Sequence, residues 1–307
     1  MQSNSPKTFR CGLAAVAGRP NVGKSTLINT LLGQKIAAVS PKPQTTRVNQ
    51  LGILTAESFQ VVFIDTPGLH KPHHKLGESM NAVAREALQE ADLILWLVDA
   101  SQPPHEEDQI ITGHLAELAS LPLVIQVLNK SDLVNAEVLA QRKAEYARLF
   151  PNVHQMAASA LSGAGLGELL ETVVRELPEG DALYPADQVT DQYEREIAAD
   201  LIREAALQHL REEVPYALAV RVDQYQERGE SGAFISATLF VEKESQKGIV
   251  IGKGGVMLKT IGQSARSAIE SMSARKVFLE LRVKVSKNWR SNPAFLKQMG
   301  YPETGGG

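Results

Sequence analysis

Gly18-Arg19-Pro20-Asn21-Val22-Gly23-Lys24-Ser25 is the stretch that decides how the first half of this chain folds. An apolar run, residues 11–17, precedes it, and a helical pattern of apolar side chains from Leu27 to Leu32 follows and ends at Gly33. The sequence therefore predicts a loop that joins a strand to a helix. In such a loop the backbone N–H groups and the positive end of the helix dipole converge on one anion, which indicates a phosphate-binding loop.

The residue types in this loop fit the chemistry of a nucleoside triphosphate. The Lys24 ammonium can reach the β- and γ-phosphates, and the Ser25 hydroxyl can ligate Mg2+. Because the spacing, the lysine, the serine and the strand-to-helix context agree, a plain glycine turn is disfavoured. We expect these residues to contact the nucleotide: Gly18, Arg19, Pro20, Asn21, Val22, Gly23, Lys24, Ser25 and Thr26.

Composition sets the limits for the rest of the chain. A length of 307 residues is typical of about two domains. The formal net charge is only −3, but residues 247–297 hold eleven Lys and Arg against two acids, so one end is strongly basic. The single cysteine, Cys11, excludes a disulfide framework and a cysteine metal site. No apolar run reaches the roughly 18 residues of a membrane-spanning helix.

Short apolar runs alternate with amphipathic helical stretches from Phe9 to about Leu177. Strands are expected near residues 11–17, 49–54, 59–65, 93–99, 123–129 and 153–158. Such alternation requires crossover connections, so the predicted fold class is α/β, with a mainly parallel sheet and helices on both faces. Ligands of these folds bind at the C-terminal ends of the strands.

The polar segment Ser40–Arg47 lies between the first helix and the next strand and carries two threonines. A mobile loop of this kind can close over a γ-phosphate, with one threonine giving its hydroxyl to Mg2+ and its N–H to the phosphate. We assign this role to Thr46, with Thr45 as the alternative. The competing interpretation is an ordinary threonine-rich loop.

Asp65-Thr66-Pro67-Gly68 ends an apolar strand and provides the other side of the predicted metal site. Asp65 can hold Mg2+ through a water, and Gly68 can bring its N–H against the γ-phosphate because it lacks a Cβ. All four residues are expected in the nucleotide site. Lys24, Thr46 and Gly68 are the predicted catalytic residues, and Ser25, Thr46 and Asp65 the predicted Mg2+ site.

Asn129-Lys130-Ser131-Asp132 ends another strand and predicts the base. The Asp132 carboxylate can accept hydrogen bonds from N1 and N2 of guanine, whereas adenine offers no such pair of donors. Asn129 is expected to brace the neighbouring loops, and the Lys130 stem can lie against the ring. A backbone N–H of Ser159-Ala160-Leu161 could reach guanine O6. An ATPase is therefore disfavoured.

Together, these five motifs resemble those of the translation-factor-related GTPases, in order and at ordinary spacing. The resemblance implies GTP hydrolysis by in-line attack of water. Leu69 occupies the position after Gly68 at which Ras-like enzymes carry a water-positioning glutamine, so slow intrinsic turnover is expected. Asn21 in the phosphate-binding loop, together with the threonine-rich loop, resembles the corresponding residues of GTPases that bind K+ beside the phosphates. This resemblance implies that K+ stimulates GTP hydrolysis. The cluster of His70, His73 and His74 has no acidic or cysteine partner at helical spacing and does not indicate a transition-metal site.

The C-terminal half has a different element order. Residues 177–187 break the helical pattern, and beyond them the order α-β-β-α-α-β is expected: a helix over 193–211, strands near 217–225, 232–242 and 277–285, and two helices around Gly252-Lys253-Gly254-Gly255. That loop resembles the Gly-x-x-Gly loop of KH domains of type II, which lets a nucleic-acid backbone approach closely. The predicted RNA-binding residues are Ile251, Gly252, Lys253, Gly254, Gly255, Lys259, Lys284, Lys287, Trp289 and Arg290. Trp289 could stack a base or pack against the domain.

Gln-Thr-Thr-Arg, Asp-Thr-Pro-Gly-Leu-His-Lys-Pro, Gly-Lys-Gly-Gly and Lys-Asn-Trp-Arg in one chain resemble the Era family of bacterial ribosome-assembly GTPases. The resemblance covers residues 7–301. It implies a GTPase domain over 7–178, a linker over 179–191, a KH domain over 192–300 and a flexible tail over 301–307.

The resemblance also implies partners and a location. The partners are GTP and GDP, single-stranded RNA near the 3′ end of the small-subunit rRNA, and the 30S subunit, whose maturation the protein would assist as a monomer. The implied location is the cytoplasm, with peripheral association at the inner membrane face. A nucleotide-regulated RNA-binding scaffold with negligible hydrolysis is the alternative; an RNA-modifying enzyme is disfavoured because no cysteine nucleophile or cofactor loop remains.

Overall fold

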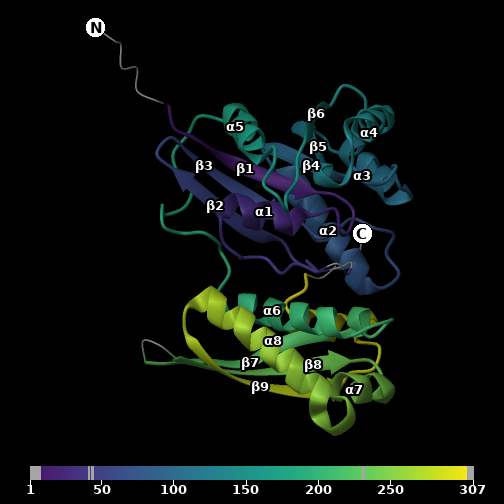
Figure 1. Cartoon of the computed structure of the whole chain (residues 1–307), viewed down its shortest axis with the longest axis vertical. Coiled ribbons are helices and arrows are strands. Elements are labelled where there is room, and N and C mark those ends of the chain that lie inside the picture. Colours follow the sequence, from purple (N-terminus) through teal and green to yellow (C-terminus); the bar gives the residue numbers. More distant parts are fainter. Residues whose placement is uncertain (1–7, 41, 43–44, 230–231, 303–307) are drawn as a thin grey trace. The chain divides into compact units, whose positions relative to one another are not determined.

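The computed structural model describes residues 8–40, 42, 45–229 and 232–302. The chain forms two compact units (Figure 1). The first comprises residues 1–35, 46–71 and 80–191, and the second residues 36–45, 72–79 and 192–307, as far as they are described. Pro41, Pro43 and Gln44 of the threonine-rich loop, and residues 303–307 of the predicted flexible tail, lie outside the described residues.

The first unit is built on a six-stranded sheet in the order β2-β3-β1-β4-β5-β6. All neighbouring strands are parallel except β2 and β3, which are antiparallel. The strands are β1 (Arg10–Ala17), β2 (Gln50–Ala56), β3 (Phe59–Asp65), β4 (Leu93–Asp99), β5 (Leu123–Asn129) and β6 (His154–Ala157). These pairings confirm the predicted mainly parallel sheet. Its strands coincide with the apolar runs of the sequence, since both faces of such a sheet are buried.

Helices cover both faces of this sheet. They are α1 (Lys24–Leu32), α2 (Lys75–Glu90), α3 (Glu106–Ala116), α4 (Ala136–Leu149) and α5 (Leu166–Glu176), with a short 3-10 turn η1 (Ser131–Leu133). Ala15 and Trp96 pack into one core with side chains of α2, α3 and α4, whereas α1 contacts β2 and β3, and α5 contacts β1. As predicted, α1 ends at Gly33, which adopts the left-handed conformation at φ 68°.

The second unit contains a three-stranded sheet in the order β7-β8-β9, with β8 antiparallel to β7 and parallel to β9. Its elements are α6 (Glu194–His209), β7 (Ala219–Arg228), β8 (Gly232–Val241), α7 (Glu244–Ile251), α8 (Val256–Ser273), β9 (Lys276–Val285) and α9 (Pro293–Gln298). Three 3-10 turns complete it: η2 (Pro215–Ala217), η3 (Lys253–Gly255) and η4 (Trp289–Ser291). The predicted order α-β-β-α-α-β is confirmed; α9, which starts at Pro293 after its cap Asn292, was not predicted.

The core of the second unit lies between the sheet and two helices. Ile197 and Leu201 of α6 and Ile261 and Ala265 of α8 are buried in one cluster with Leu239 of β8. These are the faces that the helical periods of the sequence predict. Among the described residues, no helix combines the length and apolar character that a membrane crossing requires.

Trp289 requires a correction to the predicted RNA-binding set. Its side chain is 0% exposed, and its indole N–H donates to the Ala217 carbonyl at 2.9 Å. Its ring centroid lies 5.7 Å from that of Phe295 in α9. Trp289 therefore packs in the core and offers no face to a base.

We expect Trp289→Phe to destabilise the second unit by about 1–3 kcal/mol, because the Ala217 carbonyl then stays buried without its donor. Denaturant unfolding followed by circular dichroism measures this loss. Tyr193→Phe is the control, because Tyr193 is 78% exposed and its substitution should leave the free energy of unfolding unchanged. Equal stability of both variants would contradict the packing role of Trp289.

Candidate nucleotide and nucleic-acid sites

The phosphate-binding loop is braced by Asn129 at the end of β5. The Asn129 amide donates to the Val22 carbonyl at 2.7 Å, and its Oδ1 accepts the Ala160 N–H at 2.8 Å. Gly23 adopts φ 102°, and a Cβ there would lie 2.3 Å from Asn129 Nδ2. The close approach that holds the loop therefore requires glycine at position 23, and Asn129 has the bracing role that the sequence predicts.

Lys24 lies buried beneath this loop at the start of α1. Its ammonium donates to the carbonyls of Gly18 at 3.0 Å and Arg19 at 3.1 Å, so its charged end is held inside the loop where a phosphate would bind. Burial lowers the pKa of Lys24 to about 8, and nearby Asp65 opposes this shift.

Three oxygen-bearing side chains meet at the predicted metal position. The Ser25 hydroxyl donates to Asp65 Oδ2 at 2.6 Å, the Thr46 hydroxyl donates to the same oxygen at 3.0 Å, and the two hydroxyls lie 3.1 Å apart. Thr45 instead donates its hydroxyl to the Lys42 carbonyl. The structure therefore places Thr46, and not Thr45, at this point. Hydroxyl and carboxylate oxygens are the hard ligands that suit Mg2+.

Gly68 lies directly against the phosphate-binding loop. A Cβ at position 68 would lie 2.8 Å from the Pro20 backbone nitrogen, so only glycine fits without a shift. The next residue, Leu69, is 1% exposed and belongs to the core beneath α2. In this conformation its side chain packs inward and does not face the phosphate site.

Two residues of the predicted nucleotide set use their side chains elsewhere. The Thr66 hydroxyl donates to the Val16 carbonyl at 2.8 Å and so joins β3 to β1. The Arg19 guanidinium donates to Gln102 at 2.8 Å and lies 3.6 Å from the buried carboxylate of Asp108. The side chains of Thr66 and Arg19 thus make structural contacts within the first unit.

The predicted base site follows β5 and β6. Asp132 is exposed in η1, directly after Lys130, which adopts the left-handed conformation at φ 61°. The Lys130 ammonium donates to Asp99 at 2.6 Å. Burial alone would raise the pKa of Asp99, but the hydrogen bonds from Lys130 and Ser101 outweigh it and lower that pKa. The Lys130 stem is therefore held by a carboxylate at the end of β4.

Ser159, Ala160 and Leu161 form the loop after β6. Ser159 and Ala160 are buried, whereas Leu161 is exposed. The Ser159 N–H donates to the Ala164 carbonyl at 2.9 Å, and the Ala160 N–H to Asn129. Asn129 thus joins this loop to the phosphate-binding loop, and the N–H groups of Ser159 and Ala160 already have partners within the first unit.

The predicted RNA-binding loop, Gly252–Gly255, connects α7 to α8. Gly252, Gly254 and Gly255 have φ values of 74°, 61° and 80°, a backbone path that favours glycine. A Cβ on Gly252 would lie 2.7 Å from the Met257 Cβ, whereas the space around Gly254 is open. Lys253 is exposed at the tip of this loop.

A groove of about 470 Å3 continues from this loop between α8 and β9. Its lining residues are Gly255, Leu258, Lys259, Gly262, Gln263, Arg266, Phe278, Leu279 and Leu281. Only Gly255 and Lys259 among them were predicted as RNA-binding residues. The sequence signal that could have found the others on α8 is the spacing of Leu258, Gly262 and Arg266, which places one residue per helical turn on one face of that helix.

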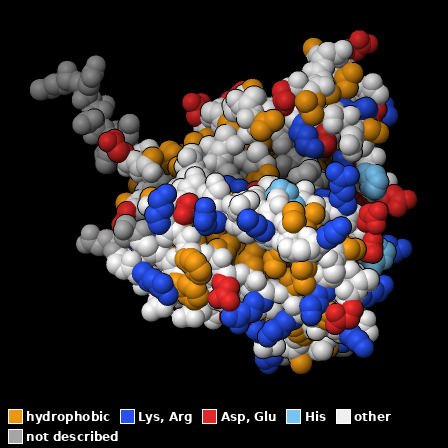
Figure 2. All heavy atoms as spheres, turned by 60° about the horizontal axis from the view of Figure 1, so that its bottom comes forward, with side chains coloured by type: hydrophobic (Ala, Val, Ile, Leu, Met, Phe, Trp, Pro, Cys, Tyr) orange, Lys and Arg blue, Asp and Glu red, His pale blue; other side chains and the backbone are white. Residues whose placement is uncertain are grey.

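The remaining predicted RNA-binding residues differ in whether their side chains are available to RNA. Lys284 and Lys287 are exposed, and Ile251 is half-buried at the end of α7. Arg290 instead donates to Glu242 at 2.6 Å, so its charge is already neutralised within the second unit. Figure 2 shows Lys and Arg side chains beside hydrophobic side chains over the face of the molecule in view.

Comparison with known proteins places both halves of the chain. Residues 13–130 match the family described as 50S ribosome-binding GTPase, and residues 213–290 match the KH domain. GTPase Era of Heliobacterium modesticaldum is 45% identical over 295 residues, covering 96% of this chain and 98% of that protein. GTPase Era of Geobacter metallireducens is 47% identical over 298 residues, covering 97% and 99%.

Two solved structures resemble the whole chain. Era in complex with MgGDPNP and nucleotides 1506–1542 of 16S ribosomal RNA has a TM-score of 0.91 and 39% identity, covering 95% of this chain and 99% of that one. A variant of Aquifex aeolicus Era bound to GDP and AlF4− has a TM-score of 0.90, with the same identity and coverage.

Fold and site together define a P-loop GTPase domain followed by a KH domain. The chain belongs to the Era family of GTPases. This membership confirms the class of enzyme and the family that the sequence motifs predict.

We expect Gly68→Ala to slow GTP hydrolysis about tenfold or more, because the added Cβ meets Pro20 and displaces the N–H aimed at the γ-phosphate. GDP binding should be unchanged, since GDP lacks that phosphate. Phosphate release under single-turnover conditions and a GDP titration measure the two effects. Gly113→Ala in α3, where a Cβ meets nothing within 4 Å, is the matched control. Full activity of Gly68→Ala would contradict the assignment.

We expect Asp132→Asn to shift binding from guanosine to xanthosine nucleotides. Xanthine has an acceptor oxygen in place of the N2 amine, and an amide can donate to it where a carboxylate cannot. Competition between GDP and XDP measures the shift. Asp181→Asn, another exposed carboxylate of the first unit, should keep the preference for guanine; an unchanged preference in Asp132→Asn would rule out its contact with the base.

Proposed function

We propose that this chain hydrolyses GTP with Mg2+ and uses the nucleotide to control binding of its KH domain to small-subunit rRNA near the 3′ end, in maturation of the 30S subunit. The observation that carries the proposal is the presence on one chain of the Asp65 metal position and of the groove beside Gly252–Gly255. The Era structure that holds both MgGDPNP and a 3′ segment of 16S rRNA supports both ligands.

The nucleotide half of the proposal rests on the residues gathered around the loop. Ser25, Thr46 and Asp65 would hold Mg2+, which supplies positive charge to the β- and γ-phosphates. Lys24 would exchange its two carbonyl partners for phosphate oxygens, and the Gly68 N–H would meet the γ-phosphate. Buried Leu69 offers no water-positioning group in this conformation, so slow turnover is expected. Stimulation by K+ at Asn21 remains a prediction.

The RNA half rests on the shape and charge of the α8–β9 groove. KH domains clamp the backbone of about four nucleotides with the Gly-x-x-Gly loop. Here exposed Lys253 supplies charge at the loop, and Leu258, Leu279 and Leu281 supply an apolar floor on which bases can lie. The exposed Lys259 and Arg266 on α8 would meet the phosphates.

The proposed control by GTP is supported by the way the threonine-rich loop is divided between the units. Residues 36–45 group with the second unit. Within that unit, the Val39 N–H donates to Glu204 of α6 at 3.2 Å, and buried Arg203 of α6 donates to the Thr45 carbonyl. The next residue, Thr46, belongs to the first unit and bonds to Asp65. The residue that bonds to α6 and the residue that bonds to Asp65 are therefore neighbours in the chain.

We propose that the domain boundaries follow those of the sequence, with a GTPase domain over 7–178 and a KH domain over 192–300. We also propose that the protein is a monomer that acts in the cytoplasm. Peripheral association with the inner membrane face remains a prediction.

Titration of a labelled single-stranded RNA with the 3′-end sequence tests the proposal. Protein loaded with Mg2+ and a non-hydrolysable GTP analogue should bind about fivefold or more tightly than protein loaded with GDP, a typical size for coupling between two sites. Gly254→Asp places a carboxylate at the open loop position, so it should abolish RNA binding while GTP hydrolysis persists. One affinity in both nucleotide states would overturn the control by GTP.

Arg203→Ala tests the proposed link itself. It should bring the two RNA affinities together, because the Thr45 carbonyl loses its partner in α6. Arg142→Ala is the matched control, since Arg142 pairs with an acid three residues away at 2.7 Å, as Arg203 does with Asp200 at 2.8 Å, but lies in α4. It should leave the ratio of affinities unchanged.

A further inference from the structure

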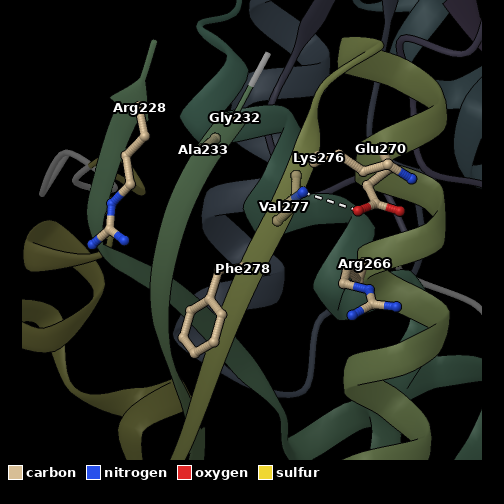
Figure 3. A pocket seen from close by; sticks show the side chains of 8 residues that line it. All are labelled: Arg228, Gly232, Ala233, Arg266, Glu270, Lys276, Val277 and Phe278. Carbon is tan, nitrogen blue, oxygen red and sulfur yellow. Dashed lines mark hydrogen bonds between the residues drawn. The ribbon is translucent and has the colours of Figure 1, made fainter.

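A second hollow of about 440 Å3 adjoins the α8–β9 groove of the C-terminal unit (Figure 3). Arg266 and Phe278 line both hollows. Beyond them the second hollow is lined by the ends of three strands: Arg228 closes β7, Gly232 opens β8 and Lys276 opens β9. A clamp on four nucleotides at the glycine loop does not require this end of the sheet.

A row of flat groups crosses the sheet at this end. The Arg228 guanidinium lies 4.9 Å from the ring centroid of Phe234, and that ring lies 5.8 Å from Phe278 with 18° between their planes. The three residues come from β7, β8 and β9, so the row ends with Phe278 on an outer strand of the sheet. Phe278 is 65% exposed, which leaves room for one more flat group.

The charges around Phe278 are mainly positive. Arg228, Arg266 and Lys276 are exposed, and Glu270, the one acid among the described lining residues, accepts the Val277 N–H at 2.9 Å. In Figure 3, Arg266 and Glu270 project from α8 toward β9, and Arg228 stands on the far side of Phe278.

This chemistry selects among the possible occupants. An aromatic face with a basic rim matches a single-stranded nucleic acid, whose bases stack and whose phosphates pair with cations. An apolar protein surface would bury three cations against the single acid Glu270 of the described lining, which is costly.

We propose that Phe278 is a base-stacking subsite for single-stranded RNA, outside the grip of the glycine loop. The inference rests on the proposed RNA-binding function. A strand that leaves the α8–β9 groove passes Arg266, stacks one base on Phe278 and places neighbouring phosphates on Arg266 and Lys276. The subsite lengthens the bound RNA beyond four nucleotides.

Affinities for a tetranucleotide and for a ten-nucleotide single-stranded RNA that contains it test the subsite. Phe278→Leu keeps an apolar side chain but removes the flat ring. It should weaken binding of the longer RNA about fivefold or more, the usual range for one lost stacked base, and weaken binding of the tetranucleotide by a clearly smaller factor, because Phe278 also borders the α8–β9 groove. Leu183→Ala, at an exposed apolar residue of the first unit, should change neither affinity.

Phe278→Trp gives a direct readout, because a stacked base quenches indole fluorescence. The two native tryptophans are 0% exposed and cannot stack on a base, so quenching that the wild-type chain lacks is assigned to position 278. Quenching by the longer RNA alone is expected. An unchanged long-RNA affinity in Phe278→Leu, equal losses for both lengths, or no quenching would each overturn the subsite and leave the proposed function standing. A wild-type chain that binds neither RNA would overturn both.

Discussion

The arrangement of the nucleotide site depends on two hydrogen bonds, in which two hydroxyl groups donate to one oxygen of Asp65. Ser25 comes from the start of α1, Thr46 from the threonine-rich loop, and Asp65 from the end of β3. Three segments far apart in sequence are thus held within hydrogen-bonding distance by a single carboxylate. A divalent cation suits the same atoms, because each is an oxygen ligand.

The other contacts of the site hold its loops together. Asn129 joins the phosphate-binding loop to the loop after β6, and Gly68 lies against Pro20 because it has no Cβ. These contacts leave little freedom for the loop. By contrast, the threonine-rich loop is divided between the two units at Thr45 and Thr46, which is why the proposed control by GTP is assigned to this loop.

Much of the fold and of the nucleotide site could be predicted from the sequence, because the motifs consist of residues that are close together in the chain. Buried runs defined the strands, and the phosphate-binding loop was recognisable from spacing and residue type. Trp289 could not be decided, since an aromatic residue after a basic strand has the same pattern whether it stacks on a base or packs inward. The contact of Arg203 with Thr45 joins positions 158 residues apart, and no local pattern carries such information. The sequence did not distinguish Phe278 from other strand residues. Its exposure depends on which strand lies at the edge of the sheet, and that order is not visible in the local sequence.

The distribution of tryptophan has a practical consequence. The chain contains two, Trp96 and Trp289, each in the core of a different unit. Indole emission from either one reports the packing of its own unit alone. Chains that retain a single tryptophan therefore separate the melting of the nucleotide-binding half from that of the RNA-binding half, and reveal whether a ligand of one half changes the cooperativity of the other.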